Sequence, residues 1–306
     1  MIDRREPLVL VTGVAGQVGA ELLGRLNLVC RVVGVGRNEL DLSDLAQIQR
    51  VVEKVRPTVI LNAAAYTAVD KAESDEPAAM RINGEAPGVL AEEARKIGAL
   101  LVHYSTDYVF DGTKDGAYVE TDHPNPLNVY GATKLAGECA IEQAAGAWVV
   151  LRTSWVYGAY GKNFLLTMLR LAEQKPELSI VADQFGAPTW ARTIAELTAR
   201  MLEVMPGGLA ATSTDWSGRS GIYHLTAAGA TSWAGFAEAI FEHAGLTSRP
   251  KVKAIGASEY PTPARRPHNS RLSGVKLAET FGIRAPHWDD ELLRCLSAMR
   301  AATSGD

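Results

Sequence analysis

The sequence predicts an α/β protein built on a doubly wound parallel sheet, with a smaller C-terminal α/β domain. Short apolar, β-branched segments alternate with longer amphipathic segments along the first half of the chain. This alternation is typical of a parallel sheet covered by helices on both faces. The first apolar segment runs into a glycine-rich turn and then into an amphipathic segment. Strand, glycine turn and helix in this order indicate a Rossmann-type fold.

The elements follow from hydrophobic period and turn residues. Strands are expected at residues 8–12, 31–35, 58–61, 100–104, 148–153 and 221–225. Helices are expected near residues 20–28, 51–56 (as the end of a helix), 77–97, 130–143, 163–174, 193–205 and 232–243. The glycine- and serine-rich stretch 206–221 is expected to be a surface excursion. The predicted domains are a cofactor-binding domain at 1–157 with a returning segment at 188–227, and a substrate domain at 158–187 and 228–306.

Composition narrows the class of protein. The 306 residues are 47% apolar and 22% charged, with a formal net charge of −4. This charge argues against a nucleic-acid binder, which usually carries a basic excess. Three scattered cysteines suggest neither a disulfide framework nor a zinc site, and the six histidines show no metal-ligand spacing, so no metal ligand is predicted. The charged N-terminus resembles neither a signal peptide nor a membrane span, so a cytoplasmic protein is expected.

The glycine-rich turn carries the first candidate site. Gly13, Gly16 and Gly19 are spaced three residues apart, with Gln17 and Val18 at the expected start of the helix. Glycine lets the backbone approach a pyrophosphate, and a helix N-terminus supplies N–H groups to bind it. These five residues are therefore predicted to bind a dinucleotide, although an ordinary glycine turn would show the same spacing.

The end of the second strand bears on the choice of cofactor. An NAD site usually has an acidic residue there, whereas an arginine accommodates a 2′-phosphate. Gly36 and Arg37 occupy this position, so Arg37 favours NADP, with a solvated surface arginine as the alternative. Asp41 and Leu42 are expected beside the adenine. NADH stays open as a second donor.

The third and fourth strands should bring further residues to the same edge, because ligands of open α/β sheets bind at the carboxyl ends of the strands. Small residues leave the third strand, where a backbone can pack against a flat ligand. From this region we predict cofactor contacts by Ala64, Ala65, Tyr66, Thr67 and Tyr104. Ser105, Thr106 and Asp107 follow the fourth strand.

Tyr130 and Lys134 open the expected helix at 130–143 and share one face of it, since positions i and i+4 are neighbours. A cation beside a phenol lowers the phenol pKa, which would suit Tyr130 to proton transfer. By itself, a tyrosine four residues before a lysine is more often a solvated pair.

Residues 260–272 contain three prolines, which forbid a regular helix. Arg265, Arg266 and Arg271 could bind phosphates by bidentate contacts. The alternative is a mobile, solvated basic loop.

The glycine spacing and the Tyr130–Lys134 pair together resemble the extended short-chain dehydrogenases/reductases. Longer segments resemble one branch, the dTDP-4-dehydrorhamnose reductase family, over nearly the whole chain. These segments are residues 62–73, 105–112, 126–131, 152–157, 183–189 and 260–272.

The resemblance implies reduction by NADPH of the C4 keto group of dTDP-4-dehydro-6-deoxy-L-mannose, the last step to dTDP-L-rhamnose for cell-surface polysaccharide. It implies that Tyr130 gives the proton, that Lys134 holds the nicotinamide ribose, and that Thr106 hydrogen-bonds the keto oxygen or Tyr130. Family members of this kind contact the sugar through residues equivalent to Asp107 and Trp155. Residues on the nucleotide side would be Arg265, Arg266, Asn269 and Arg271.

Some members of the family bind Mg²⁺ through glutamates and form a dimer around it. Glu21 could be one such ligand, but Arg192 stands where a carboxylate is expected, so the metal is in doubt and the chain is expected to be a monomer or a homodimer. Two other functions stay open. One is a nucleotide-sugar epimerase or dehydratase, although Tyr108 stands where dehydratases carry an acid. The other is a non-catalytic NADP-binding regulatory subunit.

Overall fold

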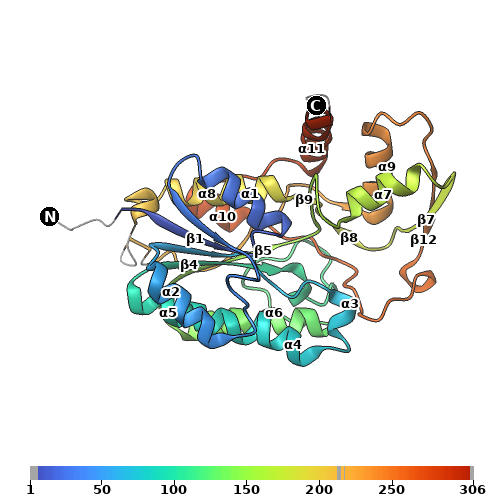
Figure 1. Ribbon diagram of the computed structural model, residues 1–306. Helices are drawn as coiled ribbons and strands as arrows, with labels where there is room; N and C mark the ends of the chain where they lie inside the picture. The colour runs from blue at the N-terminus through green and yellow to red at the C-terminus, as the bar shows by residue number, and fades with distance from the viewer. Residues whose placement is uncertain (1–5, 212–214, 217, 304–306) are drawn as a thin grey trace.

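The computed structural model describes residues 6–211, 215–216 and 218–303 and contains a central sheet between two layers of helices (Figure 1). The sheet has six strands in the order β10-β5-β4-β3-β1-β2, and every neighbouring pair is parallel. Its strands are β1 (Leu8–Thr12), β2 (Arg31–Val35), β3 (Val59–Asn62), β4 (Leu100–Thr106), β5 (Ala147–Thr153) and β10 (Gly221–His224). The predicted fold class is confirmed.

Helices cover both faces of this sheet (Figure 1). One layer holds α1 (Gln17–Leu26), α8 (Ala191–Glu203) and α10 (Val275–Phe281). The other holds α2 (Leu45–Val55), α5 (Ala86–Ile97) and α6 (Val129–Gln143), with the short α3 (Val69–Ala72), α4 (Glu76–Met80) and the π-helical turn η1 (Arg81–Glu85) at its margin. The helix expected at 193–205 returns to the first half of the chain, because α8 packs against α1.

Alternating apolar side chains build a core on each side of the sheet. Val9 and Val11 of β1 pack toward α1 and α8, whereas Leu10 packs toward α2 and α5, and all three are fully buried. Both faces of the sheet are therefore closed to a ligand. The carboxyl edge of the strands is left as the place for a site.

A small lobe lies beyond that edge (Figure 1). It contains α7 (Phe164–Ala172), α9 (Trp233–His243) and the parallel strands β7 (Glu177–Val181) and β12 (Lys251–Ile255). Four further short strands form two pairs outside the main sheet: β6 (Val156–Tyr157) pairs with β9 (Thr189–Trp190), and β8 (Phe185–Gly186) pairs with β11 (Thr231–Ser232). The last helix is α11 (Trp288–Thr303). The sequence analysis expected α7 and α9 but missed β7, β12, α10 and α11.

The surface excursion expected at 206–221 is only partly correct. It includes a short 3-10 helix, η3 (Gly208–Ala210), but Trp216 is 1% exposed and belongs to the core around α8 and α10. Residues 212–214 and 217 lie outside the described residues. The α10 helix packs against β10 although the predicted division puts 228–306 in the substrate domain. That division stays a prediction.

None of the helices among the described residues is long and apolar enough to cross a membrane.

Candidate active site

The carboxyl end of β4 turns directly into the 3-10 helix η2 (Asp107–Val109). The Thr106 hydroxyl accepts the Tyr108 N–H at 3.1 Å and donates to Asp107 Oδ1 at 3.0 Å. These bonds orient Thr106 and Asp107 together, and both side chains are at least 95% buried. Burial raises the pKa of Asp107 to about 6, against a lowering effect of the nearby Ser270 and Thr106 hydroxyls.

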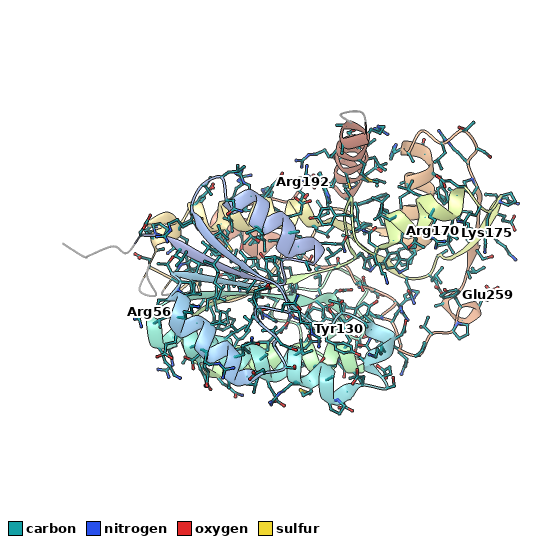
Figure 2. The ribbon with its side chains drawn as sticks, viewed as in Figure 1. Arg56, Tyr130, Arg170, Lys175, Arg192 and Glu259 are labelled. Carbon is teal, nitrogen blue, oxygen red and sulfur yellow. The ribbon has the colours of Figure 1, made fainter. Side chains whose placement is uncertain are left out.

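Tyr130 lies beside this turn because α6 presses against it. Asn128 caps α6 by accepting the Gly131 N–H at 2.8 Å. Only glycine fits at 131, because a Cβ there would lie 2.2 Å from the Tyr108 carbonyl oxygen. The Tyr130 and Tyr108 rings pack edge-to-face, with their centroids 5.9 Å apart. Figure 2 shows Tyr130 at the end of the main body that faces the small lobe.

The environment of Tyr130 raises the pKa of its phenol. Burial is the main cause, and the Asp107 carboxylate adds to it, while a hydrogen bond with Thr106 acts in the opposite direction. The sequence analysis expected Lys134 to lower this pKa, and that expectation is wrong for this structure. The desolvated phenol beside a carboxylate keeps its proton at neutral pH.

Lys134 follows Tyr130 by one turn, as predicted, but its ammonium points inward. Its Nζ donates to the Tyr104 carbonyl oxygen at 2.6 Å and lies 3.0 Å from His103 Nε2. The side chain is 1% exposed, and burial lowers the pKa of Lys134 to about 8, partly offset by Glu138. From the sequence, His103 was not assigned to the site. The only sequence signal for its contact with Lys134 is that His103 immediately precedes Tyr104 on the fourth strand.

The glycine loop has the geometry that a dinucleotide needs. Gly13 has a φ of +71°, and a Cβ there would lie 2.7 Å from the Ala64 nitrogen. At Gly19 a Cβ would lie 2.3 Å from the Gly13 carbonyl oxygen. Gly16 precedes α1 without a capping side chain, so the first N–H groups of the helix, from Gln17 and Val18 onward, can face an anion. The loop therefore fits a pyrophosphate.

The residues after β2 lie on the surface near this loop. The Arg37 side chain is 80% exposed and pairs with Asp41 at 3.5 Å. Leu42 is buried. The sequence analysis found no acid at this point, but Glu39 Oε2 accepts the Gly36 N–H at 3.0 Å. A carboxylate therefore does lie at the end of β2, three residues later than the usual position.

The residues that follow β3 are held by their backbone. Ala64, Ala65 and Thr67 leave the strand toward α3, and Asn83 accepts the Tyr66 N–H at 2.8 Å. The Tyr66 hydroxyl donates to Asp75 at 2.9 Å. Tyr104 differs from the others, because its phenol is buried against Thr198 of α8 at 2.9 Å. Only the backbone of Tyr104 faces Lys134.

Trp155 joins the end of β5 to the small lobe. Its φ is +48°, a strained value for a tryptophan. The indole stacks on Trp233 of α9, with ring centroids 3.6 Å apart, and lies against Gly186, where a Cβ would come within 2.6 Å of it. The main sheet and the small lobe thus meet at this ring.

The 260–272 segment is a strap rather than a solvated loop. Arg266 Nη2 donates to Asp70 Oδ2 at 2.8 Å, and the Asn128 side chain donates to the Arg265 carbonyl oxygen at 2.7 Å. Asn269 Nδ2 donates to two carbonyl oxygens of the 114–116 segment, and its Oδ1 accepts from Arg271. The Arg266 and Asn269 side chains are thus engaged within the protein. The Arg265 side chain is exposed.

Arg271 contributes to a cavity of about 250 Å³. Its other lining residues are Gly112, Thr113, Lys114, Asp115, Phe185, His268 and Asn269. The Lys114 charge is already paired with Asp122.

Glu21, which the family resemblance offered as a possible metal ligand, does not fit a divalent cation. Arg192, labelled in Figure 2, donates its Nε–H to Glu21 Oε2 at 3.1 Å and lies 4.8 Å from the Trp190 ring. Over the described residues no group of three or more His, Cys, Asp or Glu side chains could hold a metal ion. A guanidinium thus takes the position that a cation would need.

Comparison with known proteins gives consistent results. A family model described as the RmlD substrate binding domain matches residues 7–301. The dTDP-4-dehydrorhamnose reductase of Burkholderia thailandensis is 52% identical over 286 residues, which cover 92% of this chain and 95% of that protein. The enzyme of the same name from Escherichia coli K12 is 42% identical, covering 97% and 99%. A crystal structure of a Bacillus anthracis dTDP-4-dehydrorhamnose reductase in complex with NADP is 33% identical, with a TM-score of 0.87 and coverage of 96% and 100%.

Proposed function

The chain belongs to the family of the RmlD substrate binding domain, and from this we propose that it is an NADPH-dependent dTDP-4-dehydrorhamnose reductase. It reduces the C4 keto group of dTDP-4-dehydro-6-deoxy-L-mannose to give dTDP-L-rhamnose, a precursor of cell-surface polysaccharide. The observation that carries the proposal is the cluster of Thr106, Asp107 and Tyr130 at the sheet edge that also holds the glycine loop.

Bound NADPH would supply the hydride. Tyr130 acts as the general acid, because its raised pKa keeps the proton on the phenol until negative charge develops on the keto oxygen. The Thr106 hydroxyl, which lies between Tyr130 and Asp107, can turn from Asp107 Oδ1 to the same oxygen and stabilise its charge. Lys134 reaches the site from one turn below Tyr130 and holds the nicotinamide ribose.

The cofactor is held along the carboxyl edge. The backbone of Gly13, Gly16 and Gly19 with the start of α1 binds the pyrophosphate. Arg37 binds the 2′-phosphate, since its guanidinium is exposed at the end of β2. Further contacts come from Asp41, Leu42, Ala64, Ala65, Tyr66 and Thr67. NADH is a second donor that Glu39 could support through the ribose hydroxyls.

The substrate lies between this edge and the small lobe. Asp107 and Trp155 contact the sugar, and the Arg265 and Arg271 side chains serve the nucleotide diphosphate. Arg266 and Asn269 contribute by holding the strap in place. We further propose a cytoplasmic monomer or homodimer without a structural metal.

Two alternatives are less well supported. A dehydratase needs an acid after Asp107, but Tyr108 is there, with its ring against Tyr130. Epimerases share the fold and keep the hydride within one cycle, yet the exposed Arg37 suits an exchangeable NADPH. A non-catalytic subunit would have no need for a tyrosine at position 130 beside Thr106.

Absorbance of reduced nicotinamide tests the proposal. Purified protein, NADPH and the keto sugar, formed in place by the upstream enzymes, should give stoichiometric loss of the NADPH band with dTDP-rhamnose as product. UDP- and GDP-linked keto sugars serve as matched substrates and should react far more slowly. A flat trace with bound NADPH would overturn the reductase and support the regulatory subunit.

A further inference from the structure

Four buried side chains form a hydrogen-bonded row below the candidate active site, which we call the polar row: Thr12, Asn62, His103 and Lys134. Each is at most 1% exposed. The first three occupy the same level of neighbouring strands, because Thr12 pairs with Asn62 and Asn62 with His103 in the sheet register. Lys134 joins the row from α6. Buried polar groups are costly unless each is paired, so the direction of every hydrogen bond matters.

The donor-to-acceptor direction of these hydrogen bonds is fixed at the Thr12 end of the polar row. The Thr12 hydroxyl accepts the Ala64 N–H at 3.3 Å and lies 2.7 Å from the Asn62 amide, to which it donates its single proton. Asn62 therefore presents Oδ1 to Thr12 and Nδ2 to His103 Nδ1, at 2.9 Å. A ring nitrogen that accepts carries no proton, so the proton of the neutral imidazole is on Nε2.

His103 Nε2–H then points at Lys134 Nζ, 3.0 Å away. An ammonium has three donors and no acceptor, so it cannot complete this bond, whereas a neutral amine can accept it and still donate to the Tyr104 carbonyl oxygen. Burial is the main reason why the pKa of His103 lies well below its usual range, and a charged Lys134 lowers it further, so the imidazole is neutral in either state of the amine.

The charged groups around Lys134 allow both states of the amine. Glu138 on α6 favours the ammonium, but Arg152 of β5 pairs with Glu138 at 2.6 Å. Asp107 of η2 acts on Tyr130, the other titratable group on the same face of α6. The Lys134 pKa of about 8 therefore lies within reach of neutral pH.

We propose that His103 is a positioning residue that favours the neutral amine form of Lys134 in the free protein, so that a fraction of Lys134 that grows with pH is neutral, and that this fraction takes up a proton from solvent when NADPH binds. The inference rests on the proposed function for the identity of the ligand. Phosphates bound at the glycine loop bring negative charge to the Thr12 end of the row, and ribose hydroxyls near Nζ offer acceptors that an ammonium can use. The new proton forms an N–H bond on Nζ. The Lys134 ammonium then turns its N–H bonds toward these acceptors and the Tyr104 carbonyl oxygen and away from His103 Nε2–H, so the hydrogen-bond directions between Thr12, Asn62 and His103 stay as they are.

Calorimetry of NADPH binding in buffers of different ionisation enthalpy measures this proton. At pH 8 the protein should take up about half a proton for each NADPH bound, given a free Lys134 pKa of about 8, and more at pH 9. The His103→Asn variant keeps an acceptor for Asn62 but loses the Nε2–H donor, so its uptake at pH 8 should fall at least twofold. The matched control is His224→Asn, which removes another fully buried imidazole from the same sheet and should leave the uptake unchanged.

Equal uptake by His103→Asn and the unaltered protein would overturn the proposal. If His103→Asn does not fold, uptake by the unaltered protein that is absent or constant between pH 7 and 9 would do the same. The assay needs no keto sugar. Proton uptake on NADPH binding without turnover of the keto sugar would overturn the proposed reductase alone. NADPH binding without proton uptake would overturn this inference alone. Failure to bind NADPH would overturn both.

Discussion

Arg192 and Glu21 form an ion pair, with 3.1 Å between Nε and Oε2, that joins the start of α8 to the first turns of α1. Two guanidinium groups lie near the Trp190 ring, Arg192 at 4.8 Å and Arg294 at 5.5 Å from its centroid. Arg294 in turn pairs with Glu291 at 2.6 Å. The carboxylates in this region are therefore neutralised by arginines of the same chain.

We expect a chelator to leave the unfolding temperature and the turnover unchanged, because Arg192 already satisfies Glu21. The Arg192→Glu variant places two carboxylates together, so it should be destabilised, and added Mg²⁺ should restore part of the loss. Thermal unfolding with EDTA or Mg²⁺ measures both effects. Arg170→Glu, on an exposed part of α7, is the control and should not respond to Mg²⁺. A chelator effect on the unaltered protein would contradict the prediction.

Tyr130→Phe removes the proton donor and little else. Turnover should fall at least a hundredfold while NADPH affinity changes less than threefold, since the ring and its contact with Tyr108 remain. Stopped-flow turnover and NADPH fluorescence titration give the two values. Tyr223 lies on β10, away from the site, and its phenol donates to the Arg219 carbonyl oxygen, so Tyr223→Phe should be near normal. Comparable turnover in Tyr130→Phe and Tyr223→Phe would contradict the general-acid role of Tyr130.

Arg37→Ala should weaken NADPH binding about tenfold or more and NADH binding little, because only NADPH carries a 2′-phosphate. Glu39→Gln should act in the opposite sense, improving NADPH relative to NADH by removal of a carboxylate at the Gly36 nitrogen. Dissociation constants for both cofactors at fixed ionic strength test the pair. Equal losses for NADPH and NADH in Arg37→Ala would mean that Arg37 does not meet the phosphate.

Hydrophobic pattern predicted the main sheet well, because its strands are short and apolar. The ends of β1 and β2 were placed correctly, and the other four strands within two residues. The small lobe was harder. In β12 three residues are exposed and none is buried, and β7 alternates between exposed and buried residues over only five positions, so neither strand gives a strong local signal. The existence of β7 and β12 depends on their pairing with each other, which is a tertiary contact that a local pattern does not contain.

At the candidate site, the sequence predicted the elements that carry Thr106, Tyr130 and Lys134 but not the directions of their side chains. The Tyr130–Lys134 spacing predicted a shared helix face, yet Lys134 turns inward because the Tyr104 carbonyl oxygen and the His103 ring lie under the helix. The 260–272 arginines read as phosphate ligands, yet Arg266 is paired with Asp70, which is 196 residues away in sequence. Such pairings follow from packing of distant segments.

The pH profile of kcat/KM should fall on its acid side because Asp107 becomes protonated there. With a pKa of about 6, its carboxyl is largely protonated below pH 6 and no longer accepts a hydrogen bond from a sugar hydroxyl. We expect kcat/KM to fall up to tenfold per pH unit below that value, and the limb to disappear in Asp107→Asn at a lower overall rate. Because Asp107 also raises the pKa of Tyr130, the alkaline limb of this variant should move to lower pH. An unchanged profile would exclude this role.

The Asp107 carboxyl also makes the free energy of unfolding depend on pH. Its pKa rises from 3.8 to about 6 on folding, so between these values the folded protein holds a proton that the unfolded chain has lost. The contribution of Asp107 therefore weakens the fold as pH rises from about 4 to 6, by roughly 3 kcal/mol at 1.36 kcal/mol per pKa unit. Urea unfolding of the protein and of Asp107→Asn at each pH isolates this part. A difference between the two that does not grow over the interval would contradict it.

The buried pair of Arg152 on β5 and Glu138 on α6 offers a test of what fixes α6 to the sheet. Both side chains are at most 2% exposed, and Arg152 Nε and Nη2 both donate to the carboxylate, the shorter bond being 2.6 Å. Arg152→Met leaves Glu138 as an unpaired buried charge and should cost about 3–5 kcal/mol of unfolding free energy. The double variant with Glu138→Leu replaces both charges by apolar groups, so it should recover most of that loss.

Urea unfolding of the two single variants and the double variant completes a mutant cycle, from which the coupling energy follows directly. Exposed pairs such as Arg50–Asp44 serve as the control, because surface ion pairs contribute at most about 1 kcal/mol. If the double variant is no more stable than Arg152→Met, the charges themselves hold α6 in place. Since α6 carries Tyr130 and Lys134, turnover of the double variant then shows whether the ion pair also sets the position of the active site.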